Sequence, residues 1–212
     1  LSVFMVNVAA DIGFLIMVYS IGYMHKEEDM NRYWFFMLFF IGGMTLLVMS
    51  DNLLMLFLGW EIVGTCSWGL IGYWFKKSKD YDDPWIGTMA EGDYNAHSGM
   101  KAFITTRVGD IALLTAILLI YLFAGTFNYV ELQANNGWAV GLASVGLLIP
   151  TALLFFGGPI GKSAQFPLDV WLLEAMAGPT TVSALIHAAA MVKAGVYLVA
   201  RFLPIFIIVS AA

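Results

Sequence analysis

Nine ionisable side chains lie within long apolar stretches of this sequence, and they are the residues best suited to do chemistry. At the centre of a membrane helix an Asp, Lys or Arg costs at least about 2.5–3.5 kcal/mol, so such residues face protein or water and mark paths for ions or protons. The nine are Asp11, Glu61, Arg107, Asp110, Lys162, Asp169, Glu174, His187 and Lys193.

Lys162 and Glu61 are the strongest candidates for proton transfer. Lys162 closes an apolar run and is followed at once by polar residues, and lysine is the basic side chain whose proton affinity responds most to its surroundings. Glu61 lies deep in an apolar stretch, between Gly59 and Gly64, which permit close approach of another helix. We expect Lys162 to be its ion-pair partner; the alternative is a structural pair that fixes helix packing.

His187 and Lys193 extend the candidate path. Histidine titrates near neutral pH and is suited to relay protons, although a neutral core histidine is the alternative. Lys193 follows six residues later, about 120° around a helix, so the two residues line successive parts of a path rather than one face. Arg107 and Asp110 are three residues apart, which predicts a local supporting ion pair.

The elements that position these residues are predicted to be membrane helices. Hydrophobic residues make up 60% of the 212 residues and charged residues 12%, and the mean hydropathy is +0.81. These values exclude an ordinary soluble domain. The pattern predicts an all-α polytopic membrane protein, a single transmembrane domain over 1–212, with helices at 1–24, 33–50, 53–75, 102–124, a broken 138–176 and 180–202. Because the sequence opens and closes within apolar runs, we interpret it as part of a longer protein.

The stretch 138–176 is too long for one straight span. As a helix of 39 residues it would be about 58 Å long, nearly twice the hydrocarbon thickness of about 30 Å. The expected break points are Pro150, Gly157-Gly158-Pro159 and Phe166-Pro167. A broken membrane helix exposes backbone polar groups, which must face protein or a water-filled cavity. Lys162 is therefore expected beside a break that opens into a hydrated interior, and Asp169 and Glu174 are expected to be structural.

The distribution of basic residues predicts the orientation in the membrane. Six lie in the segments 25–32 and 76–101, and the other two connections contain none, which places 25–32 and 76–101 on the cytoplasmic side. The six are Lys26, Arg32, Lys76, Lys77, Lys79 and Lys101.

The sequence contains no motif that indicates metal binding, phosphate binding or nucleophilic catalysis. There is no His/Cys cluster with metal-ligand spacing, no phosphate-binding glycine-rich loop and no nucleophile paired with a base, so no metal or cofactor is expected on this chain. The single Cys66 excludes an internal disulfide, and the net charge of −5 predicts no nucleic-acid partner.

Four segments resemble the large antiporter-like subunit family of respiratory complex I, the L subunit in bacteria and subunit 5 in organelles. They are the opening LSVFMVNVAADIGFLIMVYSIGYM, LGWEIVGTCSWGLIGYW (58–74), KAFITTRVGDIALL (101–114) and the long GGPIGKSAQFPLDVWLLEAMAGPTTVSALIHAAAMVKAGVYLVAR (157–201). The resemblance covers essentially the whole chain except 78–98. It implies the antiporter-like inverted-repeat fold, of which this chain carries mainly the first repeat.

The resemblance also implies roles and partners. Glu61 resembles the family's essential glutamate, Lys162 the lysine of its broken helix and His187 its central-axis histidine, while Arg107 and Asp110 match its charged pair. It implies a translocase subunit of an NADH:quinone oxidoreductase in a cell or organelle inner membrane. The resemblance further implies that this subunit performs no redox chemistry itself and contacts other membrane subunits and lipid. NAD and quinone are then expected to bind to partner subunits.

Three departures leave the branch of the family open. Asp11 stands where relatives tend to have a small residue, Lys193 is more usual in sodium/proton antiporters, and the segment 78–98 is longer than the usual bacterial connection. The alternatives are a subunit of a multisubunit sodium/proton antiporter and a deazaflavin-dependent or hydrogenase-type relative. A purely structural scaffold is disfavoured, because it gains nothing from so many buried titratable groups.

Overall fold

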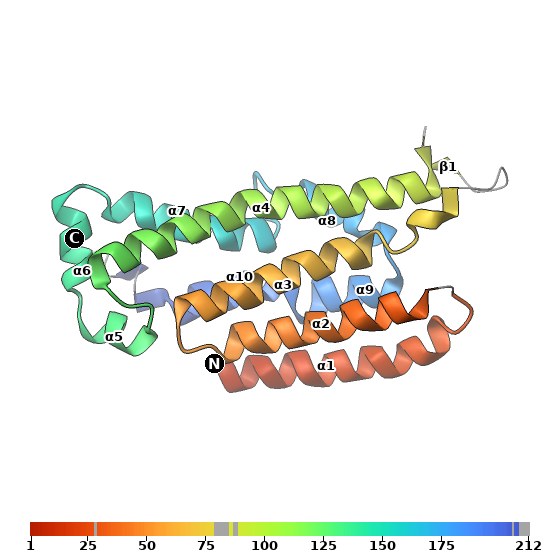
Figure 1. The fold of residues 1–212 in the computed structure, drawn as a ribbon, viewed down its shortest axis with the longest axis horizontal. Helices are drawn as coiled ribbons and strands as arrows, with labels where there is room; N and C mark the ends of the chain where they lie inside the picture. The colour runs from red at the N-terminus through yellow and green to blue at the C-terminus, as the bar shows by residue number, and fades with distance from the viewer. Residues whose placement is uncertain (28, 79–84, 87–88, 205, 208–212) are drawn as a thin grey trace.

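The computed structural model describes residues 1–27, 29–78, 85–86, 89–204 and 206–207, which form a bundle of long helices (Figure 1). In these residues a short antiparallel pair of strands, β1 (Trp85–Ile86) and β2 (Met89–Ala90), accompanies the helices. The α-helices are α1 (Ser2–Tyr23), α2 (Met30–Met49), α3 (Leu53–Ile71), α4 (Glu91–Ala124), α5 (Tyr129–Ala134), α6 (Gly137–Ser144), α7 (Leu148–Lys162), α8 (Val170–Glu174), α9 (Thr180–Ser183) and α10 (Met191–Arg201). Short 3₁₀ turns η1 (Phe75–Ser78) and η2 (Ala175–Ala177) and a π-helix η3 (Ala184–Ala189) complete them.

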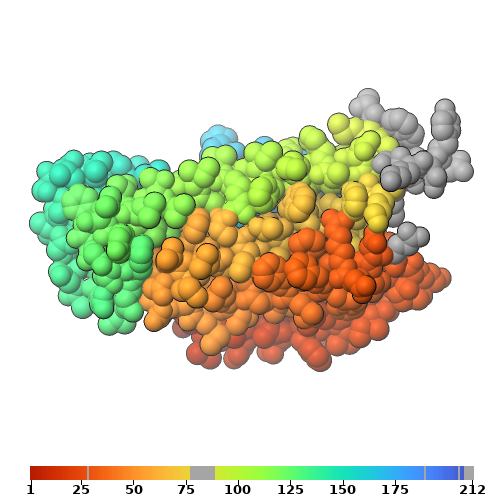
Figure 2. Space-filling view, in the orientation of Figure 1, coloured from red at the N-terminus to blue at the C-terminus, as the bar shows by residue number. Residues whose placement is uncertain are grey.

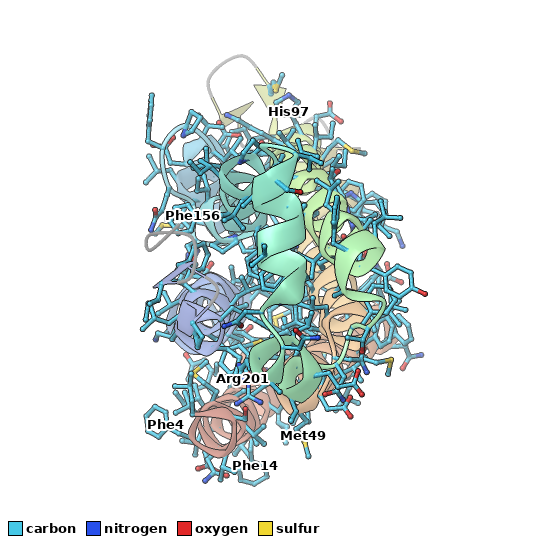
Figure 3. The ribbon with its side chains drawn as sticks, turned by 90° about the vertical axis from the view of Figure 1, so that its left-hand side faces the viewer. Phe4, Phe14, Met49, His97, Phe156 and Arg201 are labelled. Atoms are coloured by element: carbon cyan, nitrogen blue, oxygen red, sulfur yellow. The ribbon has the colours of Figure 1, made fainter. Side chains whose placement is uncertain are left out.

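Among the described residues, five helical stretches are long and apolar enough to cross a bilayer: α1, α2, α3, α4 and the run Thr180–Arg201. A sixth span results if α6 and α7, bent by 113°, count as one. Figure 3 shows this bend, with α6 running across helices that are seen end-on. The prediction of an all-α membrane protein with about six spans, one of them broken, is confirmed.

The long helices pack in a simple order that places three of them around the candidate site. α1 packs on α2, α2 on α3, α3 on α4, α4 on α7, and α7 on α10 (Figure 1). The space-filling view in Figure 2 shows α1 to α4 side by side over the length of one face. Large apolar side chains project outward, as Phe4 and Phe14 do from α1 (Figure 3), which fits a surface that meets lipid or other membrane helices.

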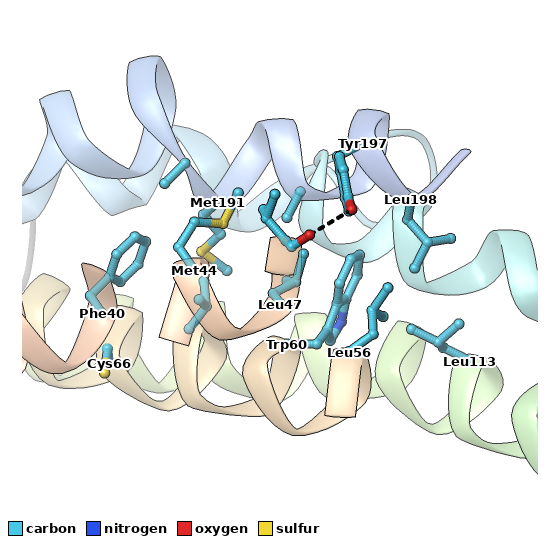
Figure 4. Close-up of a cluster of buried hydrophobic side chains, with 14 of the residues drawn as sticks. Phe40, Met44, Leu47, Leu56, Trp60, Cys66, Leu113, Met191, Tyr197 and Leu198 are labelled. Atoms are coloured by element: carbon cyan, nitrogen blue, oxygen red, sulfur yellow. Dashed lines mark hydrogen bonds between the residues drawn. The ribbon is translucent and has the colours of Figure 1, made fainter. Parts of the chain in front are cut away.

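The core lies between α10 and the α2–α3 pair. Figure 4 shows Met44 and Leu47 of α2 and Trp60 of α3 facing Met191 and Tyr197 of α10. The Tyr197 hydroxyl donates a hydrogen bond to the Val48 carbonyl oxygen at 2.9 Å, so this polar group of the core is satisfied.

The polar residues 91–101 form the first part of α4, which corrects the prediction that they belong to a loop. Residues 91–101 were expected in a loop, and α2 begins at Met30 rather than at residue 33. Glu91 and Asp93 occupy the first turn of α4, where carboxylates interact favourably with the helix dipole. The helix therefore begins well before its apolar part, and the polarity of these residues was mistaken for a loop. Much of 78–98 lies outside the described residues.

The breaks in 138–176 lie only partly where prolines predicted them. α6 ends at Ser144, and the break follows at Gly146, whose φ of +73° suits glycine. The Leu147 and Gly146 amides donate back to the carbonyl oxygens of Leu142 and Ala143 in a Schellman cap. This glycine break was not predicted. Pro150 stands in the first turn of α7, where no amide donor is needed, and Pro159 lies inside α7, so both were wrong as break points. Phe166-Pro167 does lie in the non-helical segment after α7, as predicted.

The last span is not the regular helix expected over 180–202. A π-helical turn, η3, carries His187, and the Ala190 amide donates to the Leu185 carbonyl oxygen at 3.1 Å, five residues back. Such π turns are frequent at functional sites because they re-aim the side chains that they carry.

Candidate functional site

Lys162 is the last residue of α7 and lies beside a break, as predicted. A Trp171 Nε1–H donates to the Gly161 carbonyl oxygen at 3.0 Å, so a backbone acceptor freed at this helix end is satisfied by protein. The Lys162 side chain is 1% exposed. The Lys162 side chain is thus enclosed by protein in this structure, and the hydrated interior beside the break stays a prediction.

Asp110 of α4 is the ion-pair partner of Lys162. Nζ lies 3.3 Å from Oδ2, and the Asp110 side chain is only 2% exposed. The contact lacks the alignment of a hydrogen bond and is held by charge attraction, which is strong where water is excluded. Each charge is thus compensated by the other, as a buried pair requires.

Trp60 of α3 completes this buried pair from the other side. Its Nε1–H donates to Asp110 Oδ1 at 2.5 Å, and the centre of its ring lies 5.8 Å from Lys162 Nζ. A donor to the carboxylate and a π face near the ammonium stabilise both charges. Trp60 was not singled out from the sequence; the signal that could have found it is its spacing of four from Gly64, which places both residues on one face of α3.

Two glycines make room for the cluster. A Cβ at Gly109 would lie 2.6 Å from the Gly157 carbonyl oxygen, so α4 and α7 approach backbone to backbone beside the pair. A Cβ at Gly64 would lie 2.4 Å from Lys162 Nζ. The predicted close approach at Gly59 is confirmed against α2, whereas Gly64 accommodates the lysine ammonium instead of a helix backbone.

Glu61 pairs with Arg107 and not with Lys162, which corrects the sequence prediction. The Arg107 guanidinium forms an ion pair with the Glu61 carboxylate, and its Nη2 donates to Thr65 Oγ1 at 3.2 Å. The side chains are 22% and 26% exposed for Arg107 and Glu61, in contrast to the sealed lysine. The physical reason is that the Arg107 side chain of α4 contacts Glu61, whereas the part of α3 that faces the Lys162 ammonium is Gly64.

The four charged side chains form one alternating row from a partly exposed carboxylate to a sealed ammonium. Arg107 Nη1 lies 3.8 Å from Asp110 Oδ2, so the predicted i,i+3 pair exists as a weak contact. In order the row is Glu61, Arg107, Asp110 and Lys162. Two positive and two negative charges balance, so moving one proton leaves an uncompensated charge that favours rearrangement of its neighbours.

His187 and Lys193 form no ion pair or hydrogen bond with this row. His187 is half-buried on the π turn η3, and its Nε2 is buried without a hydrogen-bond partner in the described structure. Lys193 is exposed, and its ammonium donates to the Ala188 carbonyl oxygen of the same turn. His187 is therefore carried by the π turn, and Lys193 of α10 contacts the same turn through the Ala188 carbonyl oxygen.

The other predicted ionisable residues lie outside the cluster. Glu174 forms an ion pair with Lys101, which joins α8 to α4, whereas Asp11 and Asp169 are exposed. In chemical terms the site is a row of ionisable groups that runs from a partly exposed to a buried end, an arrangement suited to passing protons by exchange of ion-pair partners.

Family profiles match nearly the whole chain. The profile described as "NADH:quinone oxidoreductase/Mrp antiporter, TM" matches residues 50–212, and that described as "NADH-Ubiquinone oxidoreductase (complex I), chain 5 N-terminus" matches residues 1–34.

Curated relatives are similar over the full chain but are much longer. NADH-quinone oxidoreductase subunit L of Escherichia coli is 46% identical over 95% of this chain and 30% of its own length. F(420)H(2) dehydrogenase subunit L of Methanosarcina mazei is 44% identical over 98% of this chain and 31% of its own length. The chain thus spans about three tenths of the relatives that it matches.

Among solved structures, an Mrp complex from Dietzia sp. superposes with a TM-score of 0.76 at 32% identity, over 93% of this chain and 20% of that one. A membrane-bound sulfane sulfur reductase, an archaeal respiratory membrane complex, shares the fold with a TM-score of 0.73 at 22% identity, over 93% of this chain and 36% of that one. These are components of multisubunit membrane assemblies. With a family profile over residues 50–212 and this fold, the chain belongs to the NADH:quinone oxidoreductase/Mrp antiporter transmembrane family.

Proposed function

We propose that this chain is part of a proton-pumping membrane subunit of a complex I-type NADH:quinone oxidoreductase. The observation that carries the proposal is the sealed ion pair between Lys162 and Asp110 at the end of a broken helix. The similarity to subunits named for NADH or F(420)H(2) dehydrogenases supports the redox-coupled assembly. NAD and quinone bind in partner subunits, which also perform the electron transfer.

The proton is held at Lys162 and released by a change of ion-pair partner. In the observed arrangement Arg107 is bound to Glu61, which leaves Asp110 to hold the lysine as a charged ammonium. When Arg107 turns from Glu61 toward Asp110, now 3.8 Å away, the lysine loses its counter-ion and gives up its proton. Returning Arg107 to Glu61 prepares the lysine to take up the next proton.

The released proton passes to the π turn of the last span. His187 offers an unpaired ring nitrogen, and the ammonium of Lys193, from α10, donates to the Ala188 carbonyl oxygen of the same turn. Hydrogen-bonded water between the row and the π turn completes the path. A change in the π turn would alter whether His187 faces the lysine, which gives a gate between the two halves of the path.

The proposal is tested by replacing the lysine in the intact complex reconstituted in vesicles. Lys162→Met should abolish proton pumping by the subunit and preserve assembly, and Lys162→Arg should fail nearly as badly because guanidinium stays protonated. Lys101→Met is the matched control, since it removes a lysine that is ion-paired with a carboxylate outside the row. Pumping at the wild-type rate in Lys162→Met refutes the proposal.

A sodium/proton antiporter is the second candidate, favoured by the 32% identity to a solved Mrp complex. The two functions differ in their driving force. Vesicles that contain the native complex should acidify when electrons are supplied and no sodium is present. Acidification that requires a sodium gradient and ignores electron donors would identify the antiporter instead.

The proposed orientation places 25–32 and 76–101 in the cytoplasm or its equivalent, in an inner membrane. It rests on the basic residues of these segments. A cysteine introduced at the exposed Lys26 should react with an impermeant thiol reagent from the cytoplasmic side only; the native Cys66 is buried.

A further inference from the structure

At the end of the bundle where α2 begins and α3 ends, an apolar groove has an arginine at its rim. The groove, of about 370 Å³, lies between α2, α3, η1 and α4, and these elements meet on the face shown in Figure 2. Its lining includes Arg32, Phe36, Trp68, Phe75, Ala96 and Met100. Ligand pockets begin at about 300 Å³, so the groove can hold a segment of an acyl chain.

The groove lies where the hydrocarbon of a membrane would end. α2 has 20 residues, about 30 Å at 1.5 Å per residue, which matches the hydrocarbon thickness. Arg32 is the third residue of this helix, so its guanidinium reaches the level of the phosphates while its stem stays in the apolar region. Trp68 and Trp74 stand at the same end of α3, as expected at a membrane interface.

The charge of Arg32 is not compensated by an ion pair with a described carboxylate. Its Nη2 donates to the Gly69 carbonyl oxygen at 3.4 Å, and its guanidinium stacks 4.6 Å from the Phe75 ring centre. Two described carboxylates that shortly precede it in the sequence are engaged elsewhere: the Glu27 carboxylate accepts from Trp74 and Asp29 pairs with Lys76. A planar, oriented guanidinium with free donors is well suited to a phosphate oxygen.

We propose that this groove binds an anionic phospholipid, with the phosphate on Arg32 and one acyl chain along Phe36, Trp68 and Met100. Lipid is the occupant that matches both an apolar floor open to the membrane side and a cation at headgroup level. The site is separate from the charge row and is independent of the proposed function.

The test measures lipid bound to the purified full-length complex in a zwitterionic detergent–lipid background by native mass spectrometry. Phosphatidylglycerol is titrated against phosphatidylcholine as the probe. Wild type should retain phosphatidylglycerol, and Arg32→Gln should bind it about tenfold more weakly, the usual effect of losing one charge-assisted hydrogen bond. Ala96→Phe, which fills the groove and leaves the charge, should also lose the lipid.

Lys26→Gln is the matched control. It removes one positive charge from the same end without touching the groove, and Lys26 is exposed. Retention of lipid in Lys26→Gln supports a defined site. Equal loss in Lys26→Gln and Arg32→Gln, equal binding of phosphatidylcholine, or no retained lipid in wild type, as when a partner subunit covers the groove, each overturns the proposal.

Discussion

Replacing Trp60 by Phe removes a hydrogen-bond donor from the centre of the buried charge row. The indole N–H donates to Asp110 Oδ1 at 2.5 Å, and no other hydrogen bond reaches that carboxylate in the described structure. Hydrogen bonds to charged groups are worth about 1.5–3 kcal/mol. The Trp60→Phe variant should therefore lose about 2 kcal/mol of unfolding free energy, with a small cavity as a further cost.

The same loss should appear in proton transfer, because Asp110 holds the proton-carrying lysine. If all of the lost 1.5–3 kcal/mol acts on the limiting step, pumping falls by roughly 10- to 150-fold at about 1.4 kcal/mol per tenfold. The carboxylate then has only Lys162 and Arg107 as partners, so the pH profile of pumping should also be displaced. A purely structural tryptophan would lower stability and leave the pH profile unchanged.

The assay is electron-driven acidification of vesicles that contain the intact complex, measured across pH. Trp138→Phe is the matched control: that indole, also buried, donates to the Leu132 carbonyl oxygen at 3.0 Å, away from the charge row. It should lose about 0.5–1.5 kcal/mol of stability and keep the wild-type pH profile. Wild-type pumping with an unshifted profile in Trp60→Phe refutes the reasoning.

Three further predictions concern the surroundings of the lysine. Gly64→Ala puts a Cβ 2.4 Å from the lysine ammonium and should cut pumping by up to about 100-fold through displacement of that group, whereas Gly42→Ala, with nothing within 4 Å, should have no effect. Glu61→Gln and Arg107→Gln should be strongly non-additive in a double-mutant cycle of pumping rates; additive effects would show that the two do not act as a unit. Lys193→Ala should slow pumping and alter its pH profile; a lower melting temperature with normal turnover and an unaltered profile would assign Lys193 a structural role on the π turn.

The class of the protein and the position of its lysine could be predicted because they depend on local properties. An apolar run of sufficient length must be a membrane helix whatever its neighbours are, and a charge inside it must have a partner. Lys162 was placed at a helix end from the polar residues that follow it. The pair of Arg107 and Asp110 followed from a spacing of three residues, although it proved weak at 3.8 Å.

Pairings between helices could not be predicted in the same way. Whether Lys162 meets Glu61 or Asp110 depends on how far α4 and α7 are rotated and how closely they approach, and that is set by contacts such as Gly109 against Gly157. A difference of a few ångströms between two carboxylates has no signature in one sequence. Trp60 was missed for the same reason, because its indole N–H has a role only when the fold brings the Asp110 carboxylate within hydrogen-bond distance.

The sequence by itself determined that this chain crosses a membrane, that its fifth span is broken, and that ionisable groups lie inside it, because hydrophobic length and the cost of buried charge act residue by residue. The tertiary structure decided which charge compensates which: Arg107 binds Glu61, and Asp110 and Trp60 hold a sealed Lys162. It also decided that the first break falls at Gly146 and that His187 sits on a π turn. These features depend on packing between helices, where backbone approach and side-chain direction choose among several electrostatically acceptable partners.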